Sequence, residues 1–407
     1  MTRILAPGHS SPPLRARGHS PPPPMSSVHR SNNFDLIRLL AAAQVVLSHA
    51  IGHTSLYGML GGWQKQLFDG LVWLPGVPVF FVISGFLITR SYERTQGDLA
   101  GYAWNRALRI FPALWICLLA TLIVLGSFGY LTSSFLSSPT FLGWLAGQVS
   151  FVQFFNPEQF RTFGVGVANG SLWTITVELQ FYVFIPLLYA TIYGKWSQGK
   201  LGSILFALLF FTSYIAYCVM NVKLNGPGGF SGGPPVFKLM FNTLLPHLWM
   251  FMVGILIHRH FEKIRPLVEG KVLLYFVPYL LLAAVMQWLI PHQSIAAYAL
   301  LLPARILLGL ATISAAYSMR HLSGKLLRGT DISYGIYIYH FLVINVFIEK
   351  GWLGSLTAIP LIFLTSVVLA LLSWHLIEKP ALSCKSLSPR DLLAKLLQAK
   401  AKSPDAT

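Results

Sequence analysis

The sequence is short of charged residues, above all acidic ones, and of cysteine. Only 11% of its 407 residues are charged, and 13 Asp and Glu stand against 30 Lys and Arg. A soluble chain of this length needs a larger polar surface, so this composition excludes an ordinary water-soluble protein. The 3 cysteines lie far apart without a CxxC spacing, which indicates neither a disulfide framework nor a zinc site.

Apolar residues take the place of the missing charge. They make up 54% of the chain, and the mean hydropathy is +0.61. A helix needs about 20 mostly apolar residues to cross the hydrocarbon core of a bilayer. We therefore predict an all-α, polytopic membrane protein with about ten transmembrane helices. The predicted spans are 34–52, 71–90, 109–130, 172–193, 201–221, 238–258, 272–290, 297–318, 332–349 and 357–378.

The basic residues predict the orientation of these spans. With ten spans, most of the 30 Lys and Arg fall on one side, which the positive-inside rule makes cytoplasmic, together with both termini. An eleventh apolar segment, 141–155, is short and contains two glutamines. Counting it as a span would move the later basic clusters to the opposite side. The net charge of +17 therefore reports membrane orientation and gives no support to nucleic-acid binding.

The two ends of the chain differ in composition from its middle. Residues 1–31 are rich in proline, serine and basic residues, and we expect them to be disordered. Residues 383–407 form a short polar tail that we expect in the cytoplasm. Residues 32–382 then form a single transmembrane domain, in which no internal repeat is visible.

The first predicted span holds three ionisable residues in an otherwise apolar helix. Arg38 and His49 are eleven positions apart, which is about 20° of helical rotation and roughly 16 Å along the axis. Asp35 lies one turn before Arg38, within reach of an ion pair. A charged stripe in a membrane helix faces the bundle interior or a water-filled cavity. The alternative is purely structural, with Asp35 paired to Arg38 and His49 bonded between helices.

A carboxylate on another predicted span is a candidate partner for His49. Glu178 lies six residues into a helix that should enter from the outer surface near Leu172. This position predicts a depth for Glu178 similar to that of His49. A buried histidine beside a carboxylate is a plausible general base with an orienting partner.

Two arginines precede the third predicted span on the cytoplasmic side. Arg106 and Arg109 are spaced i, i+3, so they share one face of the turn. With Arg38 they could hold phosphates or carboxylates, because each guanidinium presents a planar fork of donors. Alternatively, both side chains simply extend to the lipid headgroups.

The remaining polar features of the spans have weaker signals. Ser84 and Gly85 suit close packing of helices, and no GxSxG motif marks Ser84 as a nucleophile. His340, in a tyrosine-rich span, suits packing as well as function. His49 and His53 have a metal-capable spacing but no third ligand nearby, so we expect no metal.

In these segments the chain resembles the membrane acyltransferases of the acyltransferase-3 family. The resemblance extends from about residue 33 to residue 380. "DLIRLLAAAQVVLSH" is similar to the family's first-helix signature, an arginine followed by ten residues and a histidine. The similar motifs "FFVISGFL", "RALRIFP", "GSLWTITVELQFY", "SYGIYIYH" and "IEKP" follow in the family's order.

The resemblance implies a multi-pass protein of the bacterial inner membrane, without a bound cofactor. It implies transfer of an acyl group, often acetyl, from cytoplasmic acyl-CoA to a hydroxyl of a carbohydrate or glycan. His49 and Glu178 are then the expected catalytic residues, and Arg38, Arg106 and Arg109 the donor-binding ones. The residues expected to support them are Asp35, Ser84, Trp173 and His340. The alternative is a solute or proton-coupled transporter that uses the same intramembrane charges, although no repeat typical of transporters is visible.

Overall fold

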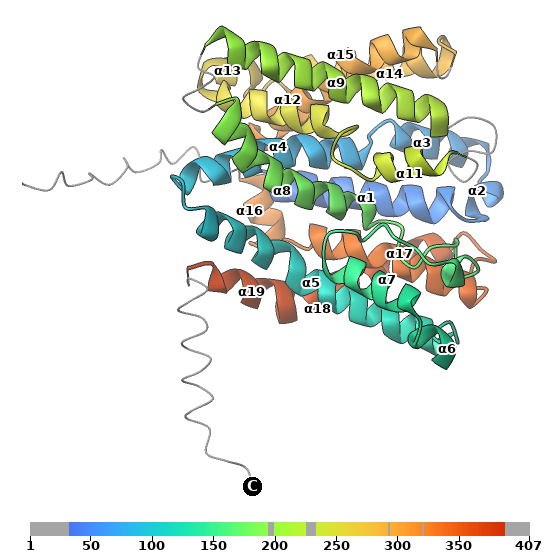
Figure 1. The fold of residues 1–407 in the computed structure, drawn as a ribbon. Coiled ribbons are helices and arrows are strands. Elements are labelled where there is room, and N and C mark those ends of the chain that lie inside the picture. Colours follow the sequence, from blue (N-terminus) through green and yellow to red (C-terminus); the bar gives the residue numbers. More distant parts are fainter. Residues whose placement is uncertain (1–31, 194–198, 225–232, 292–293, 320, 387–407) are drawn as a thin grey trace, which may run out of the picture.

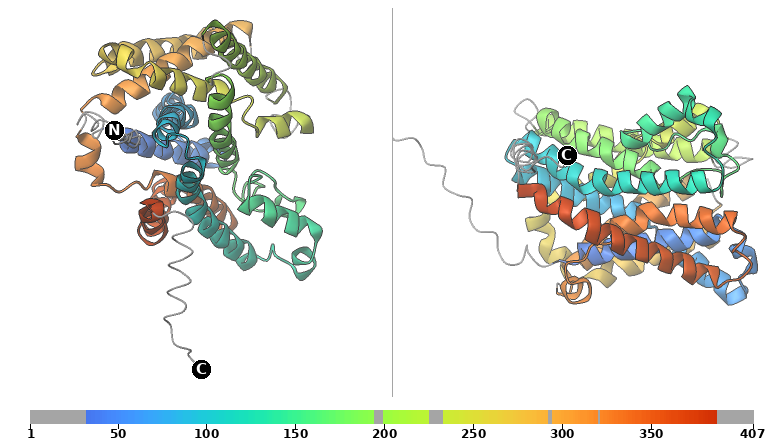
Figure 2. Two further views of the ribbon diagram at one scale, coloured as in Figure 1. Left: turned by 60° about the vertical axis from the view of Figure 1, so that its left-hand side comes forward. Right: turned by 90° about the horizontal axis from the view of Figure 1, so that it is seen from below.

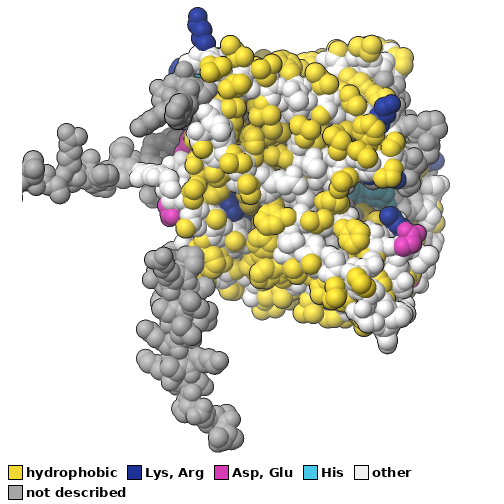
Figure 3. Space-filling view, viewed as in Figure 1, with side chains coloured by type: hydrophobic (Ala, Val, Ile, Leu, Met, Phe, Trp, Pro, Cys, Tyr) yellow, Lys and Arg dark blue, Asp and Glu magenta, His cyan; other side chains and the backbone are white. Residues whose placement is uncertain are grey.

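The computed structural model describes residues 32–193, 199–224, 233–291, 294–319 and 321–386, and within these ranges every regular element is a helix (Figure 1). The all-α prediction is confirmed. Figure 2 shows from two further sides that the long helices run roughly parallel to one another. The surface seen in Figure 3 is mostly hydrophobic, with few charged side chains, as expected where lipid replaces water.

Seven stretches of helix in the described chain are long and apolar enough to cross a membrane. A pair of helices bent by 80° would make an eighth. The seven are α1 (Phe34–Gly52), α3 with α4 (Gly62–Val72, Gly76–Arg94), α5 (Leu99–Ser127), α8 (Trp173–Thr191), α9 (Lys200–Leu224), α15 (Ile295–Tyr317) and α18 with its continuation (Ala358–Ser383). The bent pair is α13 (Phe261–Val268) with α14 (Val272–Trp288). Two shorter apolar helices are α12 (Leu248–Arg259) and α17 (Ser333–Glu349).

The predicted count of ten spans is not confirmed, because only seven to eight stretches of the described chain are long enough. Each predicted span nevertheless overlaps an apolar helix. The shorter elements are α2 (Leu56–Met59), α6 (Ser133–Leu136), α7 (Pro139–Val149), α11 (Pro235–Phe241), α16 (Leu322–Leu327) and α19 (Lys379–Ser383). The segment 141–155 contains α7, which has 11 residues. A helix of that length rises only about 16 Å, roughly half of the hydrocarbon core.

The two ends of the helix bundle differ in which short helices lie at each. Asn33, just before α1, donates to the carbonyl of Ser318 at 2.5 Å and accepts from the N–H of Ser323 at 2.9 Å. α1 therefore begins beside α16, and Figure 1 shows α16 and α19 at the same end of the molecule. We call this end the terminal face and the opposite end, with α2 and α6, the distal face.

Two small residues bring α4 and α12 into backbone contact. A Cβ on Gly85 would lie 2.1 Å from the carbonyl oxygen of Phe251, and one on Gly254 would lie 2.1 Å from that of Val82. No larger side chain fits at either position without moving a helix. The close helix packing predicted at Gly85 is therefore present.

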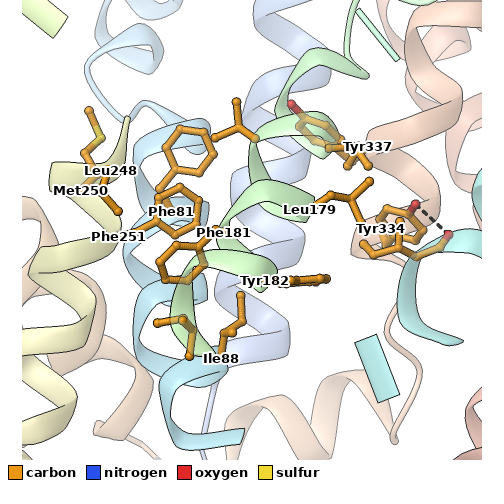
Figure 4. Packing of buried hydrophobic residues seen from close by; sticks show 14 of the residues in the cluster. Phe81, Ile88, Leu179, Phe181, Tyr182, Leu248, Met250, Phe251, Tyr334 and Tyr337 are labelled. Atoms are coloured by element: carbon orange, nitrogen blue, oxygen red, sulfur yellow. Dashed lines mark hydrogen bonds between the residues drawn. The ribbon is translucent and has the colours of Figure 1, made fainter. Parts of the chain in front are cut away.

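A stack of three phenylalanine rings fixes α8 against the same pair of helices (Figure 4). The ring centroids of Phe181 and Phe251 are 4.0 Å apart, and those of Phe81 and Phe251 are 4.6 Å apart. All three rings are buried. Because the rings come from α4, α8 and α12, they join these helices into one core.

α4 and α8 begin inside the bundle rather than at its distal surface. The N–H of Gly76, the first residue of α4, donates to Oε1 of Gln44 at 2.8 Å, halfway along α1. The loop before α8 also reaches inward, because Asn169 donates to the carbonyl of Ile338 on α17 at 2.8 Å. Residues placed a few turns along α4 and α8 therefore lie nearer the terminal face than a full-length span would put them.

Candidate active site

Two histidines from opposite ends of the sequence meet between α1 and α17. Nδ1 of His49 lies 2.9 Å from Nε2 of His340, and Nδ1 of His340 lies 3.2 Å from the carbonyl oxygen of Ile336. His340 is fully buried. Small side chains such as Ala42 and Ala50 on the contact face of α1 let the two helices approach closely enough for this contact.

The hydrogen bonds fix which nitrogen of each neutral ring carries the proton. A carbonyl oxygen only accepts, so the proton of His340 is on Nδ1 and its Nε2 is an acceptor. His49 must then donate from Nδ1, which leaves the lone pair of its Nε2 available. The arrangement holds His49 in the tautomer that a general base requires.

The distal side of this pair is lined by aromatic and polar side chains. The ring of His53 lies 5.0 Å from that of His49, and the ring of Phe341 lies 5.5 Å from it. Phe341 packs under Gly170, whose missing Cβ leaves the room for the ring. His53 is exposed, so the pair lies one helical turn below the distal surface. Among the residues described, no group of three His, Cys, Asp or Glu could hold a metal ion.

Nearer the terminal face, two arginines share one carboxylate. Oδ2 of Asp331 accepts from Nη1 of Arg38 at 2.9 Å and from Nη2 of Arg109 at 2.5 Å. Its Oδ1 accepts from the hydroxyl of Ser333 at 2.6 Å. Burial alone would raise the pKa of Asp331, but the two guanidinium groups outweigh it and hold that pKa well below its usual range.

This ion pair corrects the prediction made for the first helix. Arg38 pairs with Asp331, close to the other end of the chain, and not with Asp35. Asp35 is exposed on α1, and its charge still interacts with those of Arg38, Arg109 and Asp331 without an ion-pair contact in the described structure. Helical spacing showed that Asp35 could reach Arg38, but a partner buried with the guanidinium competes better than one in contact with solvent.

Arg106 lies within α5, since that helix begins at Leu99, earlier than predicted. Nη2 of Arg106 donates to the hydroxyl of Ser91 at 3.1 Å, while its Nε is buried without an acceptor among the described residues. Its guanidinium lies over the ring of Tyr182, 5.6 Å from the centroid. Partial burial, with the charges of Arg106 and Arg109, lowers the pKa of Lys385 to about 8. The carboxylates of Glu378 and Asp35 also lie near these arginines, so the region holds four basic and three acidic side chains.

A small cavity of about 40 Å³ leads inward from Arg38. Its walls include the carboxylate-bearing Glu178, the ring of Phe80 and the hydroxyl-bearing residues Thr174 and Tyr337. The ring of Tyr337 lies 5.9 Å from that of His340. The cavity therefore extends from the arginine cluster (Arg38, Arg106 and Arg109) towards the histidine pair and has room for a few water-sized groups.

Glu178 does not pair with His49 as predicted. Its Oε1 accepts from the hydroxyl of Tyr182 at 2.6 Å, and it shares the cavity with Arg38. The prediction assumed that α8 enters at the distal surface, whereas the helix starts deeper in the bundle. Six residues further on, Glu178 is therefore level with Arg38, and His340 takes the place beside His49.

The other predicted supporting residues lie in different surroundings. Trp173, at the start of α8, packs against the rings of His247 at 5.1 Å and Phe241 at 5.2 Å. Ser84 is half-buried on α4 beside Gly85, where α12 packs. The sequence reasoning missed Asp331. Its signal was an acidic residue directly before an apolar helix, in a chain with only 13 Asp and Glu.

Residues 31–376 match the family described as the Acyltransferase domain. The chain belongs to this acyltransferase-3 family. It is 35% identical to Nodulation protein 10 of Rhizobium leguminosarum bv. viciae, over 89% of this chain and 95% of that protein. It is 28% identical to an O-acetyl transferase of Shigella phage Sf6, over 88% of this chain and 98% of that protein.

A further relative is the peptidoglycan O-acetyltransferase OatA of Listeria monocytogenes. It is 25% identical over 77% of this chain and 49% of its own length. No solved structure matches the chain. Together with the apolar helices, these relatives establish a membrane-embedded O-acyltransferase, and a transporter is not favoured.

Proposed function

We propose that this O-acyltransferase moves an acetyl group from acyl-CoA to a hydroxyl of a carbohydrate or glycan. The donor binds at the terminal face, which faces the cytoplasm of a bacterial cell, and the acceptor arrives from the distal face. The hydrogen bond between His49 and His340 carries the proposal, because it presents a basic nitrogen close to the distal surface. Relatives named as O-acetyl and peptidoglycan O-acetyltransferases support a hydroxyl acceptor of this kind.

The reaction is a direct transfer with His49 as the general base. Nε2 of His49 takes the proton of the acceptor hydroxyl while the hydroxyl oxygen attacks the thioester carbonyl. The carbon–sulfur bond then breaks, and the thiolate of coenzyme A leaves with the proton that His49 held. His340 is a positioning residue, since it holds His49 in the required tautomer through Nδ1.

The arginine cluster binds the donor at the opposite end of the cavity. Arg38, Arg106, Arg109 and Lys385 carry four positive charges, and the carboxylates near them are those of Asp331, Glu378 and Asp35. Phosphate groups of coenzyme A are the anions that such a cluster attracts best. Glu178, on the wall of the cavity, is placed to accept a hydrogen bond from an amide N–H of the donor's pantetheine arm.

A transfer assay tests the proposal directly. Purified protein in lipid is mixed with acetyl-CoA labelled in its acetyl group and with a crude glycan. Wild type should move label to the glycan, and His49→Ala should lose about 10²–10⁴-fold in rate, the usual cost of removing a general base. Its melting temperature should stay close to that of wild type. Activity of His49→Ala within about threefold of wild type would contradict the proposed role.

A further inference from the structure

A second, larger cavity lies at the ends of several helices, and the reaction proposed above leaves it without a role. Its volume is about 460 Å³, against about 40 Å³ for the cavity beside Arg38. The last residues of α4, α12 and α15 line it, together with the first residues of α13. Small-molecule sites usually have volumes of roughly 300–1,000 Å³. This cavity is therefore large enough for a ligand of the size of a nucleotide.

The floor of this cavity is aromatic. The rings of Phe86, Phe261 and Tyr317 are buried, and the centroids of the last two lie 4.5 Å apart. The ring of Phe34, the first residue of α1, lies 5.8 Å from that of Tyr317. The cavity therefore lies beside the beginning of α1, at the terminal face. A purine can pack against aromatic rings of this kind, because every base has an apolar face.

Three arginines line the walls. Arg90 and Arg94 come from the last turn of α4, and Arg259 is the last residue of α12. Arg90 and Arg94 are spaced i, i+4, so they share one face of α4, where their charges repel each other. A bound anion relieves this repulsion. Phosphate suits it best, because a guanidinium can donate two parallel hydrogen bonds to phosphate oxygens.

Two carboxylates line the same cavity, so its ligand is not simply an anion. Oε2 of Glu93 lies 2.7 Å from Nε2 of His258, and its Oε1 accepts from the hydroxyl of Tyr189. Glu262, the second residue of α13, is exposed. A carboxylate accepts hydrogen bonds from hydroxyl and amino groups. The lining therefore suits a ligand that carries a phosphate together with hydroxyl or amino donors.

The last turn of α4 joins this cavity to the arginine cluster. Ser91 belongs to the same turn as Arg90 and Arg94. Its hydroxyl accepts from Nη2 of Arg106 at 3.1 Å. The proposed donor needs a site of this kind, because coenzyme A carries an adenosine 3′-phosphate at the end remote from its thiol. The cavity of about 40 Å³ beside Arg38 is too small for that nucleotide.

We propose that the larger cavity binds the nucleotide end of the donor, with the 3′-phosphate at Arg90 and Arg94 and the diphosphate at Arg106. The adenine packs against the aromatic floor, and the carboxylates accept from its amino group and from the ribose hydroxyl. This role rests on the proposed function and adds that the donor is acyl-CoA itself. An acyl group on a carrier protein has the pantetheine arm without the nucleotide, so it would leave the cavity empty.

Binding of coenzyme A and of 3′-dephospho-coenzyme A to the full chain tests this site without requiring transfer. Purified protein in lipid nanodiscs is titrated with each molecule by calorimetry. Wild type should bind coenzyme A at least about tenfold more tightly, because only the 3′-phosphate forms charge-assisted hydrogen bonds in the cavity. Arg90→Gln and Arg94→Gln should weaken binding of coenzyme A and leave binding of the dephospho form unchanged. Equal affinity of wild type for the two molecules would overturn the proposal.

Further variants separate this site from general effects of charge and folding. Lys325→Gln removes an exposed charge of the terminal face outside the cavity, so the ratio of the two affinities should stay at its wild-type value. Arg90→Lys keeps the charge and should recover part of that ratio. Arg94 is exposed, so Arg94→Gln should fold even if Arg90→Gln does not. An unchanged ratio in Arg94→Gln and Arg90→Lys would contradict the site.

The same measurements distinguish failure of this site from failure of the proposed function. If wild type binds neither molecule and transfers no acetyl group from acetyl-CoA, the proposed function is wrong and this site with it. If wild type transfers the acetyl group from acetyl-CoA and from acetyl-phosphopantetheine with equal kcat/KM, the function stands and the nucleotide site is wrong. The expected result is a kcat/KM at least about tenfold higher for acetyl-CoA, because binding energy from the remote nucleotide contributes to the transition state.

Discussion

At the scale of single residues, variants of His340 test whether this residue orients His49 or only fills the core. His340→Leu should lower kcat, because His49 loses the acceptor that fixes its tautomer, and should leave KM for acyl-CoA unchanged. His340→Gln offers a carbonyl oxygen in a similar position and should retain several-fold more activity than His340→Leu. Steady-state kinetics at several pH values gives both parameters. Equal losses in the two variants, with lowered melting temperatures, would mean that His340 only fills the core.

The lowered pKa of Lys385 predicts that KM for acyl-CoA depends on pH. Partial burial and the nearby guanidinium groups of Arg106 and Arg109 lower this pKa to about 8. Lys385 is therefore charged below pH 8 and loses its charge above it. If it binds phosphates of the donor, KM for acyl-CoA should rise between pH 7 and pH 9. Lys385→Arg keeps its charge throughout this range, so its KM should change much less.

The control for this experiment is an acceptor titration over the same pH range. KM for the acceptor should follow the same course in wild type and Lys385→Arg, because the acceptor binds at the distal face. If KM for acyl-CoA changes equally with pH in both proteins, Lys385 does not bind the donor.

At the scale of helices, the contact between α4 and α12 leaves no room for a side chain at Gly85. Gly85→Ala places a Cβ where the carbonyl oxygen of Phe251 lies, so the helices must separate. Overpacking of this kind costs about 1–3 kcal/mol. Gly143→Ala in α7 is a matched control, since a Cβ there meets no atom within 4 Å. Thermal unfolding in detergent should show a lower melting temperature for Gly85→Ala and no loss for Gly143→Ala.

The sequence predicts those features of the helices that depend on local properties, such as apolar length and residue spacing. Apolar length marks each span, and the spacing of Arg38 and His49 correctly places both on the inner face of α1. The starting depth of α8 was not predictable. It depends on Asn169 reaching Ile338, a contact across more than a hundred residues that no local pattern encodes. For this reason the sequence suggests His49 as the partner of Glu178, whereas in the structure Glu178 accepts a hydrogen bond from Tyr182.

The partners of the site residues were hidden for the same reason. Asp331 and His340 lie almost three hundred residues after Arg38 and His49. Helical spacing shows which residues share a face, but not which other helix covers that face. The fold brings the last third of the chain onto α1, and only then do a pair of histidines and a shared carboxylate appear.

At the scale of the whole molecule, the proposed reaction needs a donor and an acceptor on opposite sides of the membrane. The arginine cluster and Lys385 lie towards the terminal face, whereas His53 lies towards the distal face. An inverted protein would expose the donor site to a compartment without acyl-CoA. Orientation is therefore a prediction about function as well as topology.

Labelling of single cysteines checks this orientation. In a variant with Cys117, Cys218 and Cys384 replaced, Glu158→Cys and Lys325→Cys each introduce one exposed thiol, on the distal and terminal sides respectively. A membrane-impermeant maleimide should label position 158 in spheroplasts, and position 325 only after the membrane is opened. We expect this result because most Lys and Arg lie on the terminal side, and the positive-inside rule predicts that such a side is cytoplasmic.

Val46→Cys is the control for that experiment, because position 46 is fully buried and should stay unlabelled in every sample unless the fold has opened. Labelling at 325 in sealed spheroplasts, with position 158 protected, would show that the terminal face lies outside. The arginine cluster would then face away from the cytoplasmic acyl-CoA pool, and the proposed direction of transfer would be wrong. Labelling of both positions in sealed spheroplasts would instead place the two ends of the bundle on one side of the membrane, which contradicts a spanning topology for the helices between them.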